Sequence, residues 1–152
     1  MSILGIDYGA KKIGLAKSDQ GQKLALPLLV LANDGRAGVL KKLKEICQEY
    51  EIKKIIVGAP LSLQAGRRET FWRQKDLQNK QIREVLDFID WLKANISLPL
   101  DVEDERLSTK MANGMLKDLV KKGPDDAVAA MLILQSYLDK LNFKSEYRNL
   151  KH

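Results

Sequence analysis

An aspartate stands inside the apolar first segment of the chain, where a charged side chain is out of place. Asp7 follows the run Ile3–Ile6 and lies between Gly5 and Gly9. Burying a carboxylate costs several kcal/mol unless something pairs with it. Glycine within a strand often marks the close approach of a ligand or of another backbone. We therefore expect Asp7 to bind a cation or a phosphate-linked group, the alternative being an Asp that only starts a turn.

Two further acidic residues lie where predicted elements begin or end. Glu105 closes the predicted last strand, and Asp126 opens the predicted final helix. Three carboxylates that converge repel one another and need a divalent cation to be stable. Mg²⁺ and Mn²⁺ prefer oxygen ligands, and two such ions about 3.5–4 Å apart can promote phosphodiester cleavage by water. If the three acids meet, the pattern favours metal-dependent hydrolysis of a phosphodiester.

Each of these acids also has an ordinary structural explanation. Glu105 could pair with a basic neighbour at the surface, and Asp126 or Asp125 could simply cap the following helix. Spacing alone does not separate Asp126 from Asp125. The same ambiguity holds on the strand, where the other acids beside Glu105 are Asp101, Glu103 and Asp104. Composition and pattern alone thus point only weakly to a carboxylate site.

Cysteine and histidine are too scarce in this chain for several kinds of catalytic and metal site. Among 152 residues there is one cysteine, Cys47, and one histidine, His152. A cysteine-based zinc site and a Ser-His-Asp or Cys-His arrangement are disfavoured as a result. The helical spacing around Cys47 predicts a small core residue and not a reactive thiol. Acid–base and metal chemistry must then rest on carboxylates, lysines or water.

The elements that position these residues follow from hydrophobic periodicity and turn residues. Strands are predicted over 2–8, 11–18, 24–31, 52–60 and 98–105, and helices over 39–50, 81–95, 108–122 and 125–141. Pro27 places the third strand at a sheet edge, and Asn33 or Asp34 is expected to cap the first helix. The order predicts an α/β three-layer domain, in which an antiparallel meander and then parallel strands form a mixed five-stranded sheet with helices on both faces.

We expect one domain over residues 1–142, followed by a loose polar tail over 143–152. The apolar face predicted for the last helix consists of Val128, Met131, Leu132, Gln135 and Leu138. No apolar run approaches the ~20 residues that a membrane helix needs, and no signal peptide is legible. The single cysteine fits a reducing compartment. We therefore expect a cytoplasmic protein without a membrane partner.

The charge of the chain points to a polyanionic partner. The net charge is +6 at pH 7, which favours nucleic acid. Residues 65–83 include six basic and two acidic residues together with Phe71 and Trp72. Basic side chains beside aromatic ones suit a phosphate backbone with exposed bases, the alternative being a solvated loop whose aromatics dock on the core. The basic residues predicted to bind nucleic acid are Lys11, Lys12, Arg67, Arg68, Arg73 and Lys75.

Several segments, taken in order, resemble one known family. They are Gly5–Gly9 with Ile13–Ala16, then Ile56–Leu61, Asp104–Thr109 and Asp126–Gln135. Together they resemble the YqgF family, also called the RuvX or RuvC-like Holliday-junction-resolvase-like family, within the RNase H-like superfamily. The resemblance covers about residues 2–140, and its last two segments are the most specific. Residues 64–80 depart from the family pattern, so no contact is carried over from them.

The resemblance implies an RNase H-like fold and a metal-dependent nuclease that matures the 5′ end of pre-16S ribosomal RNA in the cytoplasm. It assigns the catalytic and metal-binding carboxylates to Asp7, Glu105 and Asp126, with Mg²⁺ or Mn²⁺ as the cofactor. It also places Arg106 and Thr109 beside the site or the substrate backbone. RNA is favoured over DNA as the substrate, with ribosome-assembly factors as partners and a monomer or weak homodimer as the assembly.

Three other functions fit parts of the pattern. The Asp-x-Gly of the first strand also resembles the phosphate loop of actin-like and sugar-kinase ATPases, but those need two such domains and 152 residues hold one. A Holliday junction resolvase acting on DNA would need a symmetric dimer, for which no interface is legible. A non-catalytic nucleic-acid-binding accessory protein is disfavoured by the presence of all three acids.

Overall fold

A computed structural model of the chain describes residues 1–59, 80–104 and 125–150. The described elements are β1 (Ser2–Tyr8), β2 (Lys12–Ser18), β3 (Ala25–Ala32), α1 (Arg36–Glu49), β4 (Ile52–Ala59), α3 (Lys80–Asn95), β5 (Leu100–Asp104) and α6 (Asp125–Leu150). Each of them corresponds to a predicted strand or helix, and α6 departs most from its predicted bounds. The predicted helix over 108–122 lies outside the described residues. So does the loop expected over 61–80, except for Lys80, which begins α3.

The strands form one mixed sheet in the order β3-β2-β1-β4-β5. β1, β2 and β3 are an antiparallel meander, whereas β4 and β5 run parallel to β1. β3 lies at an edge, as Pro27 predicted, and its register against β2 shifts where Ala16 pairs with Pro27. The carboxyl ends of β1, β4 and β5 share one edge of the sheet because these strands are parallel. The mixed five-stranded α/β architecture is thus confirmed.

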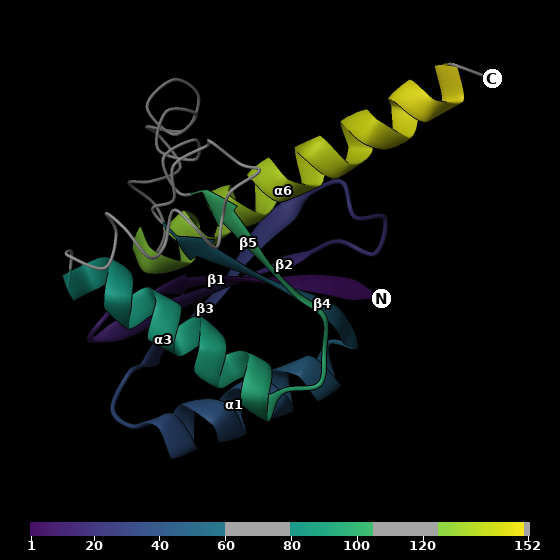
Figure 1. Cartoon of the computed structure of the whole chain (residues 1–152). Helices are drawn as coiled ribbons and strands as arrows, with labels where there is room; N and C mark the ends of the chain where they lie inside the picture. The colour runs from purple at the N-terminus through teal and green to yellow at the C-terminus, as the bar shows by residue number, and fades with distance from the viewer. Residues whose placement is uncertain (60–79, 105–124, 151–152) are drawn as a thin grey trace.

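Helices cover both faces of this sheet, with α1 and α3 on one face and α6 on the other (Figure 1). Side chains alternate between the faces along each strand. Leu4 and Ile6 of β1 therefore pack in the core under α1 and α3. Ile3 packs in a second core under α6, with Ile56 of β4 and Leu134 of the helix. Continuing the alternation from Ile3 through Gly5 places Asp7 on the α6 face.

The first helix begins differently from the prediction. Its N-cap is Gly35, at a φ of 147°, and no side chain makes a capping hydrogen bond there. The expected cap at Asn33 or Asp34 is therefore wrong. Asn33 instead donates from Nδ2 to the carbonyl oxygen of Gly9 at 2.9 Å, and its backbone N–H donates to the carbonyl oxygen of Lys11 at 2.9 Å. The side chain that could have capped α1 instead holds the turn between β1 and β2.

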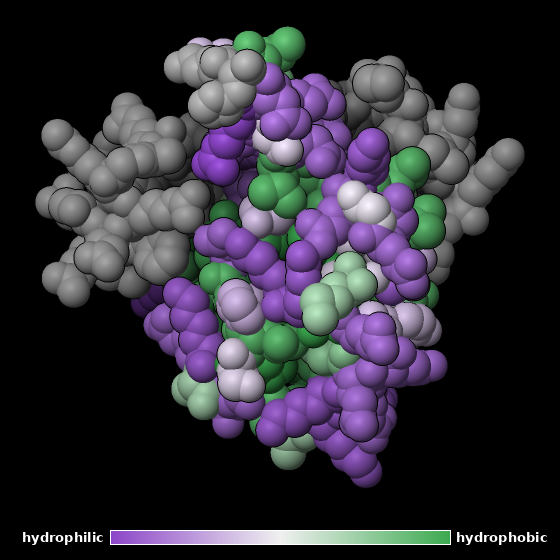
Figure 2. All heavy atoms as spheres, turned by 90° about the vertical axis from the view of Figure 1, so that its right-hand side faces the viewer, coloured by the Kyte–Doolittle hydropathy of each residue, from purple (hydrophilic) through white to green (hydrophobic). Residues whose placement is uncertain are grey.

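The last helix is longer than predicted. It continues to Leu150 instead of ending near Leu141, so residues 143–150 are helical. The helix contains no glycine or proline that would end it. Phe143 and Tyr147 are 69% and 52% exposed on the part that projects beyond the sheet (Figure 1). Figure 2 shows that side of the molecule as mainly hydrophilic, with apolar residues in small groups.

The buried face of α6 is also rotated from the prediction. Met131, Leu132 and Gln135, all assigned to the apolar face, are only partly buried. The buried side chains include the small ones of Ala127 and Ala130. Val128 and Leu138 are buried as predicted, but the other buried positions include Leu134, which contacts the sheet at Gly5. The prediction missed part of this face because small side chains such as Ala130 carry little hydrophobic signal. Among the described helices, none is long and apolar enough to cross a membrane.

Candidate carboxylate site at the sheet edge

The predicted acidic residue of the first strand lies on the central strand of the sheet. Asp7 is the penultimate residue of β1, is partly buried, and pairs with Gly14 of β2. Cα atoms of such antiparallel partners lie about 4.5–5.5 Å apart. Because β1 has a hydrogen-bonded neighbour on each side, its backbone holds Asp7 rigidly near the edge where β1 and β4 end.

The first turn of α6 rests directly on the residue that faces Asp7. A methyl group at Gly14 would lie 1.9 Å from the carbonyl oxygen of Asp126 and 3.0 Å from the backbone nitrogen of Ala127. Only a residue without a Cβ permits this approach. The structure therefore brings Asp7 and Asp126, two of the three predicted carboxylate residues, to the same place on the sheet.

A second glycine extends the close contact along the helix. A Cβ at Gly5 would lie 2.8 Å from the Cβ of Leu134 and 3.1 Å from the carbonyl oxygen of Ala130. Gly5 and Gly14 share the α6 face of adjacent strands, since Gly5 pairs with Ala16. The two glycines together let the α6 backbone approach the sheet. The close contact at these two glycines determines how near the start of α6 lies to Asp7.

The third predicted carboxylate, Glu105, lies outside the described residues, directly after the end of β5 in the sequence. Within β5, Glu103 pairs with Gly58 and Asp104 pairs with Ala59, so the strand ends at the same sheet edge as β1. Both of these acids are buried. The predicted nucleic-acid contacts that also lie outside the described residues are Arg67, Arg68, Arg73, Lys75, Arg106 and Thr109.

The two basic residues predicted near the first turn are described and exposed. Lys11 lies in the turn and Lys12 begins β2. Lys12 precedes Gly14 by two residues, so strand alternation places it on the same face as Asp7 and Asp126. Lys12 is thus an exposed basic residue on the face that carries the two acids.

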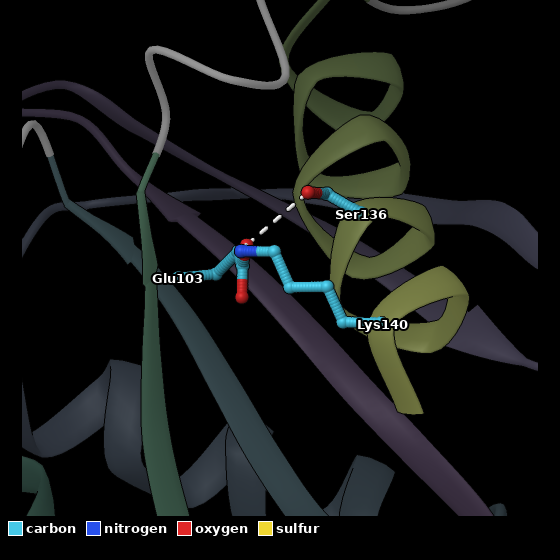
Figure 3. Close-up of polar contacts among 3 residues, drawn as sticks. All are labelled: Glu103, Ser136 and Lys140. Carbon is cyan, nitrogen blue, oxygen red and sulfur yellow. Dashed lines mark hydrogen bonds and ion pairs between the residues drawn. The ribbon is translucent and has the colours of Figure 1, made fainter. Parts of the chain in front are cut away.

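A buried acid on β5 makes contacts that the sequence did not single out. The side chain of Glu103 is 6% exposed, accepts a hydrogen bond from the Ser136 hydroxyl at 3.1 Å and forms an ion pair with Lys140 (Figure 3). Ser136 and Lys140 are one turn apart on α6. A polar pair at this helical spacing, opposite an acid in a strand, was the signal available in the sequence.

A second polar contact joins the same strand and helix. Lys54 of β4 forms an ion pair with Asp101 at 3.1 Å and donates a hydrogen bond to the Tyr137 hydroxyl at 2.8 Å. Burial alone would lower the pKa of Lys54, but its hydrogen bonds to Tyr137 and Asp101 outweigh burial and raise that pKa. Lys54 therefore stays charged and connects β4, β5 and α6.

The donor chemistry at the sheet edge fits a hard divalent cation. Asp7 and Asp126 offer carboxylate oxygens, the ligands that Mg²⁺ and Mn²⁺ prefer. Among the described residues, no group of three or more His, Cys, Asp or Glu side chains is arranged to hold a metal ion. A third carboxylate for such a site would have to come from outside the described part of the chain, where Glu105 lies.

The family model and the similar proteins agree on one family for this chain. The model of the family described as "RuvX: Holliday junction resolvase" matches residues 1–140. A protein of Rickettsia typhi named "Putative pre-16S rRNA nuclease" is 36% identical over an alignment of 144 residues, with 91% of this chain and 85% of that protein covered. A protein of the same name from Rickettsia bellii is 33% identical over 145 residues, covering 92% and 87%.

Solved structures support the fold. The RuvC protein of Thermus thermophilus bound to a Holliday junction superposes with a TM-score of 0.54 at 16% identity, covering 91% of this chain and 94% of that one. Another structure of Thermus thermophilus RuvC gives a TM-score of 0.52 at the same identity. At this identity the likeness establishes the fold, which is RNase H-like as the sequence resemblance implied.

Proposed function

The chain belongs to the RuvX family, a family of nucleases, and from this premise we propose that it is a divalent-metal-dependent nuclease acting on RNA. Asp7, Glu105 and Asp126 are the proposed metal-binding carboxylates. One observation carries the proposal. Gly14, the partner of Asp7, lies so close to α6 that its Cβ would overlap the backbone of Asp126. With the helix start this close to the partner of Asp7, the Asp7 and Asp126 carboxylates would lie near each other, and a bound cation would offset their repulsion.

Each residue of the proposed site has a role that follows from its position. Asp7, on the central strand, and Asp126, in the first turn of α6, would bind the ion through their carboxylate oxygens, and Glu105 would complete the set. A bound Mg²⁺ or Mn²⁺ supplies charge stabilisation at the phosphate and lowers the pKa of water. Lys12, exposed on the same face, would attract and orient the phosphate backbone. No histidine is needed for this arrangement.

We propose that the substrate is the precursor of 16S ribosomal RNA, processed at its 5′ end in the cytoplasm. The names of the relatives from Rickettsia support this substrate. The net charge of +6 supports a nucleic acid partner in general. The proposed nuclease domain spans residues 1–142, with ribosome-assembly factors as partners and a monomer or weak homodimer as the assembly.

Metal dependence is tested by cleavage assays on labelled single-stranded RNA, a precursor-rRNA fragment and a four-way DNA junction. Each is incubated with Mg²⁺, Mn²⁺ or EDTA. We expect cleavage of the precursor with either metal, none in EDTA, and a loss of at least about 10²-fold in Asp7→Asn. Asp90→Asn is the matched control, because Asp90 is exposed on α3. Cleavage that persists in EDTA or in Asp7→Asn contradicts the carboxylate mechanism.

A second candidate is a Holliday junction resolvase, favoured by the description of the family that the chain matches. It predicts paired cuts in the four-way junction by a dimer and little cleavage of the precursor RNA. Binding of any of these nucleic acids without cleavage under all metal conditions would instead indicate a non-catalytic accessory protein. The same assay separates the three possibilities.

A further inference from the structure

The strand that leads to Glu105 is attached to α6 in a different way from the other strands. Among the described residues, the buried apolar cluster under α6 includes Ile3 of β1, Ala16 of β2, Ala25 of β3 and Ile56 of β4, and no residue of β5. β5 also lies at the sheet edge, with β4 as its neighbour. Apolar packing therefore does little to fix where β5 lies relative to α6.

Polar contacts take the place of that packing. Glu103 points from β5 toward α6, where it contacts the Ser136 hydroxyl and the Lys140 ammonium group (Figure 3). Asp101, two residues earlier on the same face, reaches the helix through Lys54, which bonds to Tyr137. Apolar contacts are non-directional, whereas a buried carboxylate with two partners has one satisfactory arrangement. Buried ion pairs contribute little net stability but can specify one register.

This contact lies between the two segments that carry proposed carboxylates. Glu105 follows Glu103 by two residues, and Asp126 begins the helix on which Ser136 and Lys140 lie. α6 is continuous from Asp125, so a shift of the helix along β5 at Ser136 moves Asp126 by the same amount. The Glu103 contact thus sets the offset between the end of the strand and the start of the helix.

We propose that Glu103 is a positioning residue: through Ser136 and Lys140 it fixes the register of β5 against α6, and thereby the offset between the end of the strand that precedes Glu105 in the sequence and the helix start that carries Asp126. This inference rests on the proposed function, because it matters only if those two acids hold a metal ion together. Outer-shell partners of metal ligands typically change metal affinity by about 10–100-fold when they are replaced.

The variant Glu103→Leu separates positioning from stability. Replacing a buried ionic group with an apolar one of similar volume is often neutral for stability. Lys140, whose side chain is 48% exposed, can turn to solvent, and the Ser136 hydroxyl can donate to the carbonyl four residues earlier. Glu103→Gln is the conservative variant, since its side-chain oxygen still accepts both hydrogen bonds. Asp101→Asn is the matched control, because it weakens the contact one step farther from the strand end.

The test measures Mn²⁺ binding to each full-length protein by isothermal titration calorimetry without nucleic acid, beside urea unfolding of the same samples. We expect Glu103→Leu to unfold near the wild-type urea midpoint but to bind Mn²⁺ at least about tenfold more weakly. Glu103→Gln and Asp101→Asn should stay within about threefold of the wild type. If Glu103→Leu does not fold, the double variant Glu103→Leu/Lys140→Met, which replaces both partners of the ion pair with apolar side chains, is used in its place, with a loss of the same order expected.

The outcomes also separate the two proposals. Wild-type affinity in the folded variant would overturn the positioning role while leaving the proposed function intact. An equal loss in Asp101→Asn would overturn it too, by showing a general effect of β5–α6 contacts. Wild-type protein that binds no Mn²⁺, or Asp7→Asn protein that binds it as well as wild type, would overturn the proposed function and this inference with it.

Discussion

At the scale of single residues, the candidate site depends on a glycine, because a side chain at that position would collide with α6. Gly14 has no Cβ, and the space where one would stand is taken by the backbone of Asp126. The sequence indicated this position only as a glycine in a strand. Its partner in β1, Asp7, stands out in the sequence because a charged residue is unusual in an apolar strand, and its role stays a prediction. The reason for Gly14 could not be predicted, because it depends on a helix more than a hundred residues away in the chain.

Gly14→Ala is expected to displace the first turn of α6. The new methyl group would lie 1.9 Å from the Asp126 carbonyl oxygen, so the helix must shift, at a cost of about 1–3 kcal/mol in the free energy of unfolding. A shift of about 1 Å at the site can lower the cleavage rate about 10²-fold. Urea unfolding and the cleavage assay measure both effects.

Gly38→Ala is the control for this substitution. Gly38 lies in α1 with no atom within 4 Å of an added Cβ. Alanine there should raise the free energy of unfolding by about 0.5–1 kcal/mol and leave cleavage unchanged. Equal destabilisation by the two substitutions would show that the close contact between Gly14 and α6 does not limit the size of the side chain there.

Cys47 should react slowly in the folded protein, as its predicted place against the core implied. Burial raises the pKa of its thiol from 9.0 to about 11, so at pH 8 the thiolate is scarcer in the folded chain than in the unfolded one. Alkylation by iodoacetamide at pH 8 is expected to be much slower in buffer than in concentrated urea. Above pH 9 the unfolded state loses its proton first, so this thiol lowers stability as the pH rises from 9 to 11. Equal alkylation rates at pH 8 would show that the thiol is accessible.

At the scale of elements, α6 shows both the reach and the limit of sequence reasoning. Its start at Asp125 was predicted, because an acidic pair after Gly-Pro precedes a long apolar run. Its buried face was predicted only in part: Val128 and Leu138 are buried as expected, but Ala127 and Ala130 carry little hydrophobic signal and were missed. The prediction that Asn33 caps α1 was wrong for a related reason. Its type fits a helix cap, but a turn elsewhere in the chain uses its amide.

Removing residues 143–152 is expected to leave the fold intact. The helical residues removed include Phe143, Tyr147 and Leu150, all exposed. The free energy of unfolding should therefore fall by no more than about 1 kcal/mol, because exposed positions contribute only tenths of a kcal/mol each.

Leu138→Ala, at a fully buried position of the same helix, provides the contrast. It should cost about 2–5 kcal/mol when both proteins are unfolded in urea. A truncated protein as unstable as Leu138→Ala would show that the projecting part of α6 supports the core.

At the scale of the whole molecule, charge connects the site with its proposed substrate. The chain carries a net charge of +6, yet its basic residues are not equivalent. Lys11 and Lys12 lie at the turn beside Asp7, whereas Lys41 and Lys42 are exposed on α1, on the opposite face of the sheet. Arg67, Arg68, Arg73 and Lys75 stay predictions, since they lie outside the described residues.

The double variant Lys11→Ala/Lys12→Ala should weaken RNA binding and flatten its dependence on salt. Each lost phosphate contact is expected to reduce the slope of log K against log salt concentration by about 1. The variant Lys41→Ala/Lys42→Ala changes the net charge by the same amount and should leave the slope unchanged. Fluorescence anisotropy with labelled RNA at several salt concentrations measures both slopes. Equal slopes for the two variants would indicate that only net charge matters.

The length of α6 has a practical consequence for studying this protein. Its 26 residues span about 39 Å at 1.5 Å per residue, with Asp126 at one end and the exposed segment at the other. A fluorophore or a surface tether placed at Tyr147 would therefore stand clear of incoming nucleic acid, while remaining rigidly joined to the helix that starts at the site. Immobilisation through that end would present every molecule to its substrate in the same orientation.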